Sequence, residues 1–69
     1  MATVKQQIAE HDAVALREAT GKWDAGRTGT VVSDYGEVKL VEIADERGTA
    51  LDYVQVPESR LKLLTRHGH

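Results

Sequence analysis

The stretch "GRTGTVVSDYG", residues 26–36, decides the fold that this sequence predicts. Gly26 and Gly29 lie close together, β-branched residues follow, and a turn-forming Asp-Tyr-Gly ends the run. A nucleotide-binding loop would need a strand before the glycines, a helix after them, and a third glycine or a Lys-Ser/Thr pair. Here the glycines lead into a strand. We therefore expect Gly26 to adopt a positive φ at a loop end, and Gly29 to allow a bulge or a close backbone crossing.

The sequence on both sides of this stretch predicts further strands. A long turn-rich loop, residues 19–27, precedes it, and Gly48 supplies the positive φ that a hairpin loop needs. Pro57 has no N–H for a strand ladder, so a strand should end there and one helical turn should follow. Alternating or dense apolar residues predict strands at 13–18, 28–35, 37–45, 50–56 and 61–65.

Five short strands would leave one sheet with a bare apolar face, and curling the sheet buries that face. We predict a mainly β fold: a small five-stranded SH3-like barrel over residues 13–65, with one short helical turn before the last strand. Residues 1–12 are predicted to be a tail or a short helix, with Val4 and Ile8 on one face, and residues 66–69 a disordered tail. The predicted core is Val14, Leu16, Val31, Leu40, Val41, Ile43, Leu51, Val54, Val56 and Leu61.

The amino-acid composition favours some classes of function over others. The chain has 69 residues, enough for one domain, and nine Lys and Arg against eleven Asp and Glu give a formal net charge of −2. Nucleic-acid-binding proteins normally carry a basic surface, because neutralising phosphates supplies much of their affinity. The basic residues here are dispersed, and one Trp, two Tyr and no Phe make a poor stacking platform. The composition disfavours a nucleic-acid site and favours a protein partner.

The absence of cysteine excludes disulfides and thiolate metal sites. No apolar run approaches the roughly 20 residues that span a bilayer, and no signal-peptide pattern begins the chain. We expect a cytoplasmic protein without membrane contact.

The residues "AGRTGTVVSDYGEVKLVEIADERGTALDYVQVPESRLKLL", 25–64, carry a resemblance. Together with "HDAVALRE" at 11–18 they resemble a small bacterial family of SH3-like β-barrel proteins whose function is uncharacterised. More distantly, the chain is similar to the KOW modules of ribosomal proteins and transcription factors. The closer resemblance implies a partner-binding subunit, such as an antitoxin, an immunity protein or an accessory partner of a neighbouring small protein. It implies no catalytic residues. The chain departs from the family at Lys39 and Ile43, where the family prefers aromatic residues.

The polar residues do not predict an enzyme, a cofactor or a metal site. His67 and His69 flank a glycine at the end of the chain, His11 lies far away in sequence, and no cysteine completes a tetrahedral set. The acidic residues are best explained as a solvated face, because a barrel of this size has little room for a catalytic cleft.

Trp23 is the strongest candidate for binding. It lies in the long loop, where it serves either as a lid over one mouth of the barrel or as an interface anchor, since Trp, Tyr and Arg dominate binding hot spots. We predict a non-enzymatic protein-binding module whose candidate interface is Trp23, Arg27, Tyr35 and Tyr53. A KOW-like nucleic-acid-binding module is the alternative, and the identity of the partner and the oligomeric state stay open.

Overall fold

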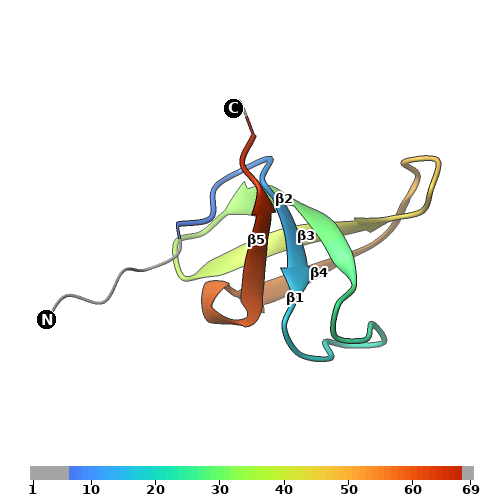
Figure 1. Cartoon of the computed structure of the whole chain (residues 1–69), viewed down its shortest axis with the longest axis horizontal. Helices are drawn as coiled ribbons and strands as arrows, with labels where there is room; N and C mark the ends of the chain where they lie inside the picture. Colours follow the sequence, from blue (N-terminus) through green and yellow to red (C-terminus); the bar gives the residue numbers. More distant parts are fainter. Residues whose placement is uncertain (1–6, 68–69) are drawn as a thin grey trace, which may run out of the picture.

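The computed structural model describes residues 7–67, and these residues form one antiparallel sheet (Figure 1). The sheet order is β4-β3-β2-β1-β5, and a single 3-10 turn, η1 (Glu58–Arg60), connects β4 to β5. The mainly β fold predicted from the sequence, with five antiparallel strands and one short helical turn before the last strand, is confirmed. None of the helical structure between residues 7 and 67 is long and apolar enough to cross a membrane. The strands are β1 (Ala13–Leu16), β2 (Thr28–Asp34), β3 (Val38–Ala44), β4 (Ala50–Pro57) and β5 (Leu61–Thr65).

The curvature of the sheet lets its two ends share one core. In Figure 1, β1 and β5 cross in front of β3 and β4, and buried residues from all five strands form a single cluster. Alternation along β3 is strict: Lys39, Val41 and Ile43 are buried, while the residues that alternate with them face outward and are half-buried. The buried apolar residues are Ile8, Val14, Leu16, Val31, Val41, Ile43, Val56 and Leu61.

Two residues of the predicted core lie elsewhere. Leu40 is half-buried on the outer face of β3, because Val41 and Ile43 occupy the inward positions of that strand. Leu51 is 48% exposed, because Val54 and Val56 fix the inward face of β4 and leave Leu51 on the other side. The prediction that Leu40 and Leu51 belong to the core was wrong.

The glycines of the 26–36 stretch act through the backbone. Gly26 has a φ of +91° at the end of the β1–β2 loop, where an L side chain would be strained. Gly29 packs against β3: a Cβ there would lie 2.6 Å from Val41 Cγ1 and 2.7 Å from the carbonyl oxygen of Glu42. The expected close crossing at Gly29 is therefore confirmed, and its physical basis is contact with β3.

The segment before β1 is docked on the barrel. Ile8 is buried in the core, and Asp12, which is 3% exposed, accepts hydrogen bonds from the backbone N–H groups of Ala9 (2.9 Å) and His67 (2.8 Å). Burial would raise the pKa of Asp12, but the N–H groups of His67 and Ala9, together with the nearby charge of Arg66, outweigh it and the net shift is downward. The segment before β1 and the segment after β5 are thus tied together by one charged carboxylate. Val4, expected to share a helical face with Ile8, lies outside the described residues.

Candidate binding surface

Trp23 is placed by a tight turn within the β1–β2 loop. The backbones of Thr20 and Trp23 exchange two hydrogen bonds of 2.8 and 2.9 Å across Gly21 and Lys22, and Gly21 takes a φ of +57°. The loop is tied to the barrel further on, because Gly26 N–H donates to the Leu16 carbonyl (2.7 Å). The tryptophan is therefore held on a short, internally bonded turn.

The indole of Trp23 is fixed at both its polar and its apolar parts. Its Nε1–H donates to Asp52 Oδ2 on β4 (2.9 Å), and its ring packs, half-buried, against the hydrophobic core. The Arg27 guanidinium lies 4.9 Å from the ring centroid and the Lys22 ammonium 5.2 Å from it, both within cation–π range. Trp23 is thus a lid on the core and still presents part of its ring at the surface.

Arg27 connects this lid to the far end of β3. Its Nη2 donates to the Ala44 carbonyl (2.8 Å) while its guanidinium stacks on Trp23. The hydrogen bond from the Trp23 indole lowers the pKa of Asp52, and the Tyr53 backbone N–H lowers it further. Asp52 therefore stays charged at neutral pH beside the two cations that flank the tryptophan.

A bulge in β4 places the apolar side chain of Leu51 in the same hollow as Arg27. The β3–β4 pairing passes from Ile43↔Asp52 to Ala44↔Ala50, which leaves Leu51 as the extra residue. Bulges re-aim side chains in this way. Leu51 and Arg27 line one open surface hollow, whose other lining residues are Thr28, Ala44, Asp45 and Glu46. We call Trp23, Arg27 and this hollow the Trp23 surface.

The other two candidate residues lie apart from Trp23 and Arg27. Tyr35, 60% exposed, is in the β2–β3 turn, where its N–H donates to the Val38 carbonyl at the opposite end of β3 from Ala44. Tyr53 is 55% exposed and points to the face of β4 opposite to Asp52, and its hydroxyl donates to Glu42 Oε2 (3.3 Å). The structure therefore brings together two of the four predicted interface residues.

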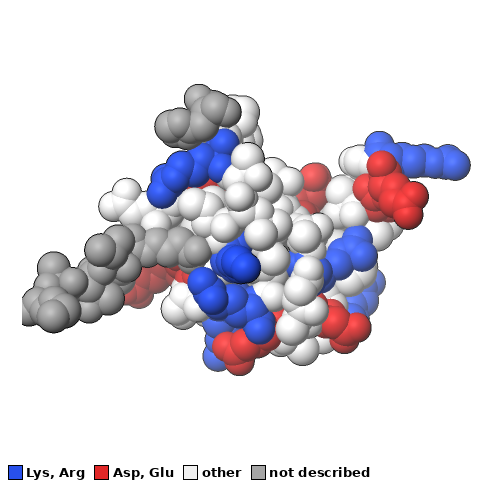
Figure 2. Space-filling view, viewed as in Figure 1, with Lys and Arg blue, Asp and Glu red and all other residues white. Residues whose placement is uncertain are grey.

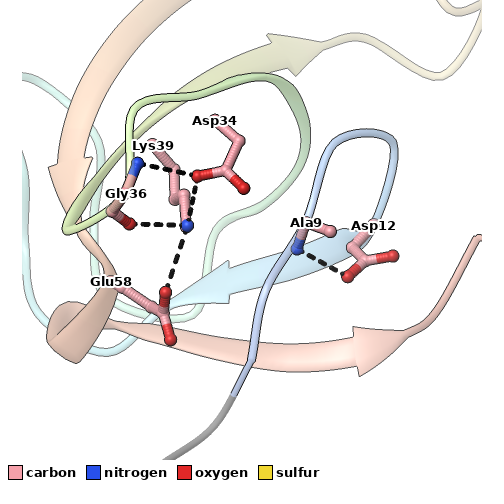
Figure 3. A network of polar contacts seen from close by, with 6 residues as sticks. All are labelled: Ala9, Asp12, Asp34, Gly36, Lys39 and Glu58. Carbon is pink, nitrogen blue, oxygen red and sulfur yellow. Dashed lines mark hydrogen bonds and ion pairs between the residues drawn. The ribbon is translucent and has the colours of Figure 1, made fainter.

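Lys39 closes the opposite end of β3 (Figure 3). It occupies an inward position and is 3% exposed, and its Nζ donates to Asp34 Oδ1, to Glu58 Oε1 (3.1 Å) and to the Gly36 carbonyl (2.6 Å). Burial would lower the pKa of Lys39, but the bonds to the two carboxylates outweigh it and raise it. The Lys39 bond, followed by the Gly36 N–H, lowers the pKa of Asp34. We call these four residues the Lys39 cluster.

The charges on the surface are mixed. On the face shown in Figure 2, Lys and Arg side chains lie beside Asp and Glu side chains, both over the body of the barrel and at the tip of the β3–β4 hairpin. Arg60, for example, pairs with Glu18 at 3.5 Å. This face carries no continuous basic surface of the kind that follows a phosphate backbone.

The comparisons with known proteins add no relative. A scan of protein-family models, a search of curated proteins and a search of solved structures each gave no match for this chain.

Sequence reasoning missed Leu51, Asp52 and the Lys39 cluster. Alternation could have indicated the orientations of Leu51, Asp52 and Lys39. In "ALDYVQVP", Asp52 shares the inward face with Val54 and Val56, so Leu51 must point elsewhere. In "VKLVEIA", Lys39 shares the inward face with Val41 and Ile43, which signals a buried cation in need of carboxylates.

Proposed function

We propose that this chain is a non-enzymatic protein-binding module that holds its partner on the Trp23 surface. The observation that carries the proposal is a half-buried tryptophan in cation–π contact with Arg27, which in turn lines an open hollow together with the exposed Leu51. Trp and Arg are the residue types that contribute most to protein interfaces. An exposed leucine at the same place supplies apolar area that a partner can cover.

The Trp23 surface is also rigid before binding. The indole is bonded to Asp52, and the Arg27 side chain is bonded to the Ala44 carbonyl. Ordering side chains at an interface costs roughly 0.5–1.5 kcal/mol for each flexible side chain. Because Trp23 and Arg27 are already ordered by the fold, little of that cost remains when a partner binds.

The charges around the hollow indicate the chemistry of the partner. Arg27 is engaged by Trp23 and by Ala44, whereas Glu46 makes no ion pair within residues 7–67. Asp45 adds a second carboxylate, held by the N–H groups of its own hairpin loop. The partner that fits is a protein with an apolar side chain for Leu51 and a basic side chain beside it for Asp45 and Glu46.

The alternative nucleic-acid-binding function is less well supported, because the carboxylates at the hollow would repel phosphates. The two functions differ in their response to salt. A protein contact through Leu51 and Trp23 should weaken little between 50 and 200 mM salt, while several phosphate contacts would cost about 10³-fold or more in affinity over that range.

The test compares three baits in a lysate of the native host: the wild type, Leu51→Ser and Tyr35→Ser. Leu51 and Tyr35 are both large and exposed, but only Leu51 belongs to the Trp23 surface. We expect one protein to be captured by the wild type and by Tyr35→Ser, and Leu51→Ser to bind it about 1–2 kcal/mol more weakly in a titration. Equal binding by Leu51→Ser, or capture that depends on Tyr35, would place the interface elsewhere.

A further inference from the structure

Two histidines from opposite ends of the chain meet on one side of the barrel. The imidazole rings of His11 and His67 have centroids 5.1 Å apart and planes inclined at 55°. His11 precedes β1, and His67 follows β5, the strand that pairs with β1. The pairing of these two strands therefore carries both rings to the same place.

The backbones on which the two rings stand are held by the fold. His11 has a φ of 74°, the only positive φ at a non-glycine residue between residues 7 and 67, and its N–H donates to the Val31 carbonyl (2.6 Å). The N–H of His67 donates to the buried Asp12, whose other carboxylate oxygen accepts from Ala9. The two histidines are thus anchored through neighbouring backbone groups, and their rings stay accessible.

The separation of the rings matches that of two histidines on one metal ion. In tetrahedral zinc sites the Zn–N distance is about 2.0–2.1 Å, which puts each ring centroid about 3.2 Å from the metal and two centroids about 5 Å apart. The observed distance of 5.1 Å agrees with this value.

The carboxylate of Glu10 lies beside the His11 ring, as a carboxylate often does beside a metal-binding histidine. Glu10 Oε1 lies 3.4 Å from His11 Nε2. Histidine ligands commonly give their second ring nitrogen to a carboxylate, which orients the ring and makes it a better donor. With Nε2 of His11 directed to Glu10, Nδ1 is the nitrogen left for a metal.

We propose that His11 and His67 together bind a divalent transition-metal ion of the zinc, nickel and copper class. Imidazole nitrogen is the ligand type that suits these ions. Within residues 7–67 no group of three or more His, Asp or Glu side chains is arranged as a complete site, so water or a group from another molecule fills the remaining positions. Such a metal ties the segment before β1 to the segment after β5, and this link goes beyond the protein-binding function proposed above.

The test is a titration of the full chain with Zn²⁺, followed by its melting temperature and by NMR of the histidine rings. The variants are His11→Asn, which keeps a residue type that tolerates positive φ, and His67→Gln. His69→Gln is the matched control, because His69 belongs to the same His-Gly-His sequence. We expect Zn²⁺ to raise the melting temperature of the wild type and of His69→Gln, and to leave His11→Asn and His67→Gln unchanged.

A second arm keeps the result independent of how well the variants fold. In the wild type, the ring signals of His11 and His67 should shift together at the same Zn²⁺ concentration, and Glu10→Gln should bind about tenfold more weakly. The proposal is overturned if the wild type does not bind Zn²⁺. It is equally overturned if His11→Asn binds as well as the wild type while His69→Gln does not, because the ion would then be held by the C-terminal His-Gly-His alone.

Discussion

The two ends of β3 are closed in different ways. At the Val38 end the inward-facing Lys39 is buried and bonded to two carboxylates and a backbone carbonyl. At the Ala44 end the closing residue is Trp23, which is half-buried and bonded to Asp52. The Lys39 cluster seals its end with polar contacts made within the chain. The Trp23 surface seals the core but leaves an aromatic ring and a leucine facing outward.

This difference is the reason why we propose the binding site at the Ala44 end of β3. Every hydrogen of the Lys39 ammonium has an acceptor within the chain, so a partner has nothing to gain there beyond the contacts already made. At the Trp23 surface, by contrast, the side chains of Trp23 and Arg27 are hydrogen-bonded within the chain, while the apolar side chain of Leu51 stays exposed. Burial of that area is what a protein partner can add. We therefore propose that the Val38 end of β3 serves stability and that the partner binds at the Ala44 end.

The largest loss of stability is expected at Gly29, where β2 packs against β3 between the two ends of that strand. Gly29→Val places side-chain atoms where Val41 Cγ1 and the Glu42 carbonyl already lie, at 2.6 and 2.7 Å from the new Cβ. Since the obstacle includes backbone, we expect the variant to be unfolded at room temperature, as measured by circular dichroism. A folded Gly29→Val variant would show that β2 and β3 do not cross as closely as described.

A smaller loss is expected at the Lys39 end. Lys39→Ala leaves the carboxylates of Asp34 and Glu58 without their cation and opens a void, and should cost about 1–3 kcal/mol. The cost stays moderate because the side chains of Asp34 and Glu58 are 37% and 23% exposed and water can reach them.

Lys39→Met, which keeps the volume of the side chain, should lose less stability than Lys39→Ala, and neither variant should change the affinity for the partner. Urea unfolding and a binding titration on the same samples measure both quantities. A loss of binding in Lys39→Met with stability preserved would contradict the division between the two ends.

The smallest expected effect is a difference between the Val38 end and the Ala44 end of β3 in how their contributions to folding stability depend on pH. The pKa values of Asp34 and Asp52 are both lowered in the folded state. Their contributions to folding stability are therefore complete above the ordinary pKa of 3.8 and disappear as the pH falls through the lower folded pKa values. The pKa of Lys39 is raised, so its contribution is complete below 10.5 and disappears as the pH rises through the higher folded value.

The acid-induced loss should be reduced more by Lys39→Met than by Trp23→Phe, because a charged donor holds a carboxylate more strongly than a neutral indole does. Urea midpoints measured at a series of pH values below 5 test this order. Equal reductions in the two variants would mean that the two ends respond to acid alike.

Pattern and turn chemistry predicted the strands, the positive φ at Gly26 and Gly48, and the close approach at Gly29. These features depend on local backbone geometry and on alternation, which the sequence carries directly. The bulge at Leu51 could not be predicted in the same way, because no local signal in the sequence marks where the β3–β4 register shifts.

Local sequence patterns could not predict contacts between segments that are distant in the sequence. The bond from Trp23 to Asp52 and the approach of His11 to His67 arise only when distant strands pair. The grouping of Tyr35 and Tyr53 with Trp23 rested on residue type alone, and residue type does not say on which face or at which end of a sheet a side chain lies.

Site-specific photo-crosslinking is the most direct test of whether the partner binds at the Ala44 end of β3. A photoreactive phenylalanine analogue placed at Leu51 samples the Trp23 surface, and the same analogue at Tyr35 samples the end closed by Lys39; both positions are well exposed, so the probe itself disturbs the core at neither. After irradiation with the captured partner, we expect a covalent adduct from position 51 and none from position 35. An adduct from position 35, with none from position 51, would contradict it.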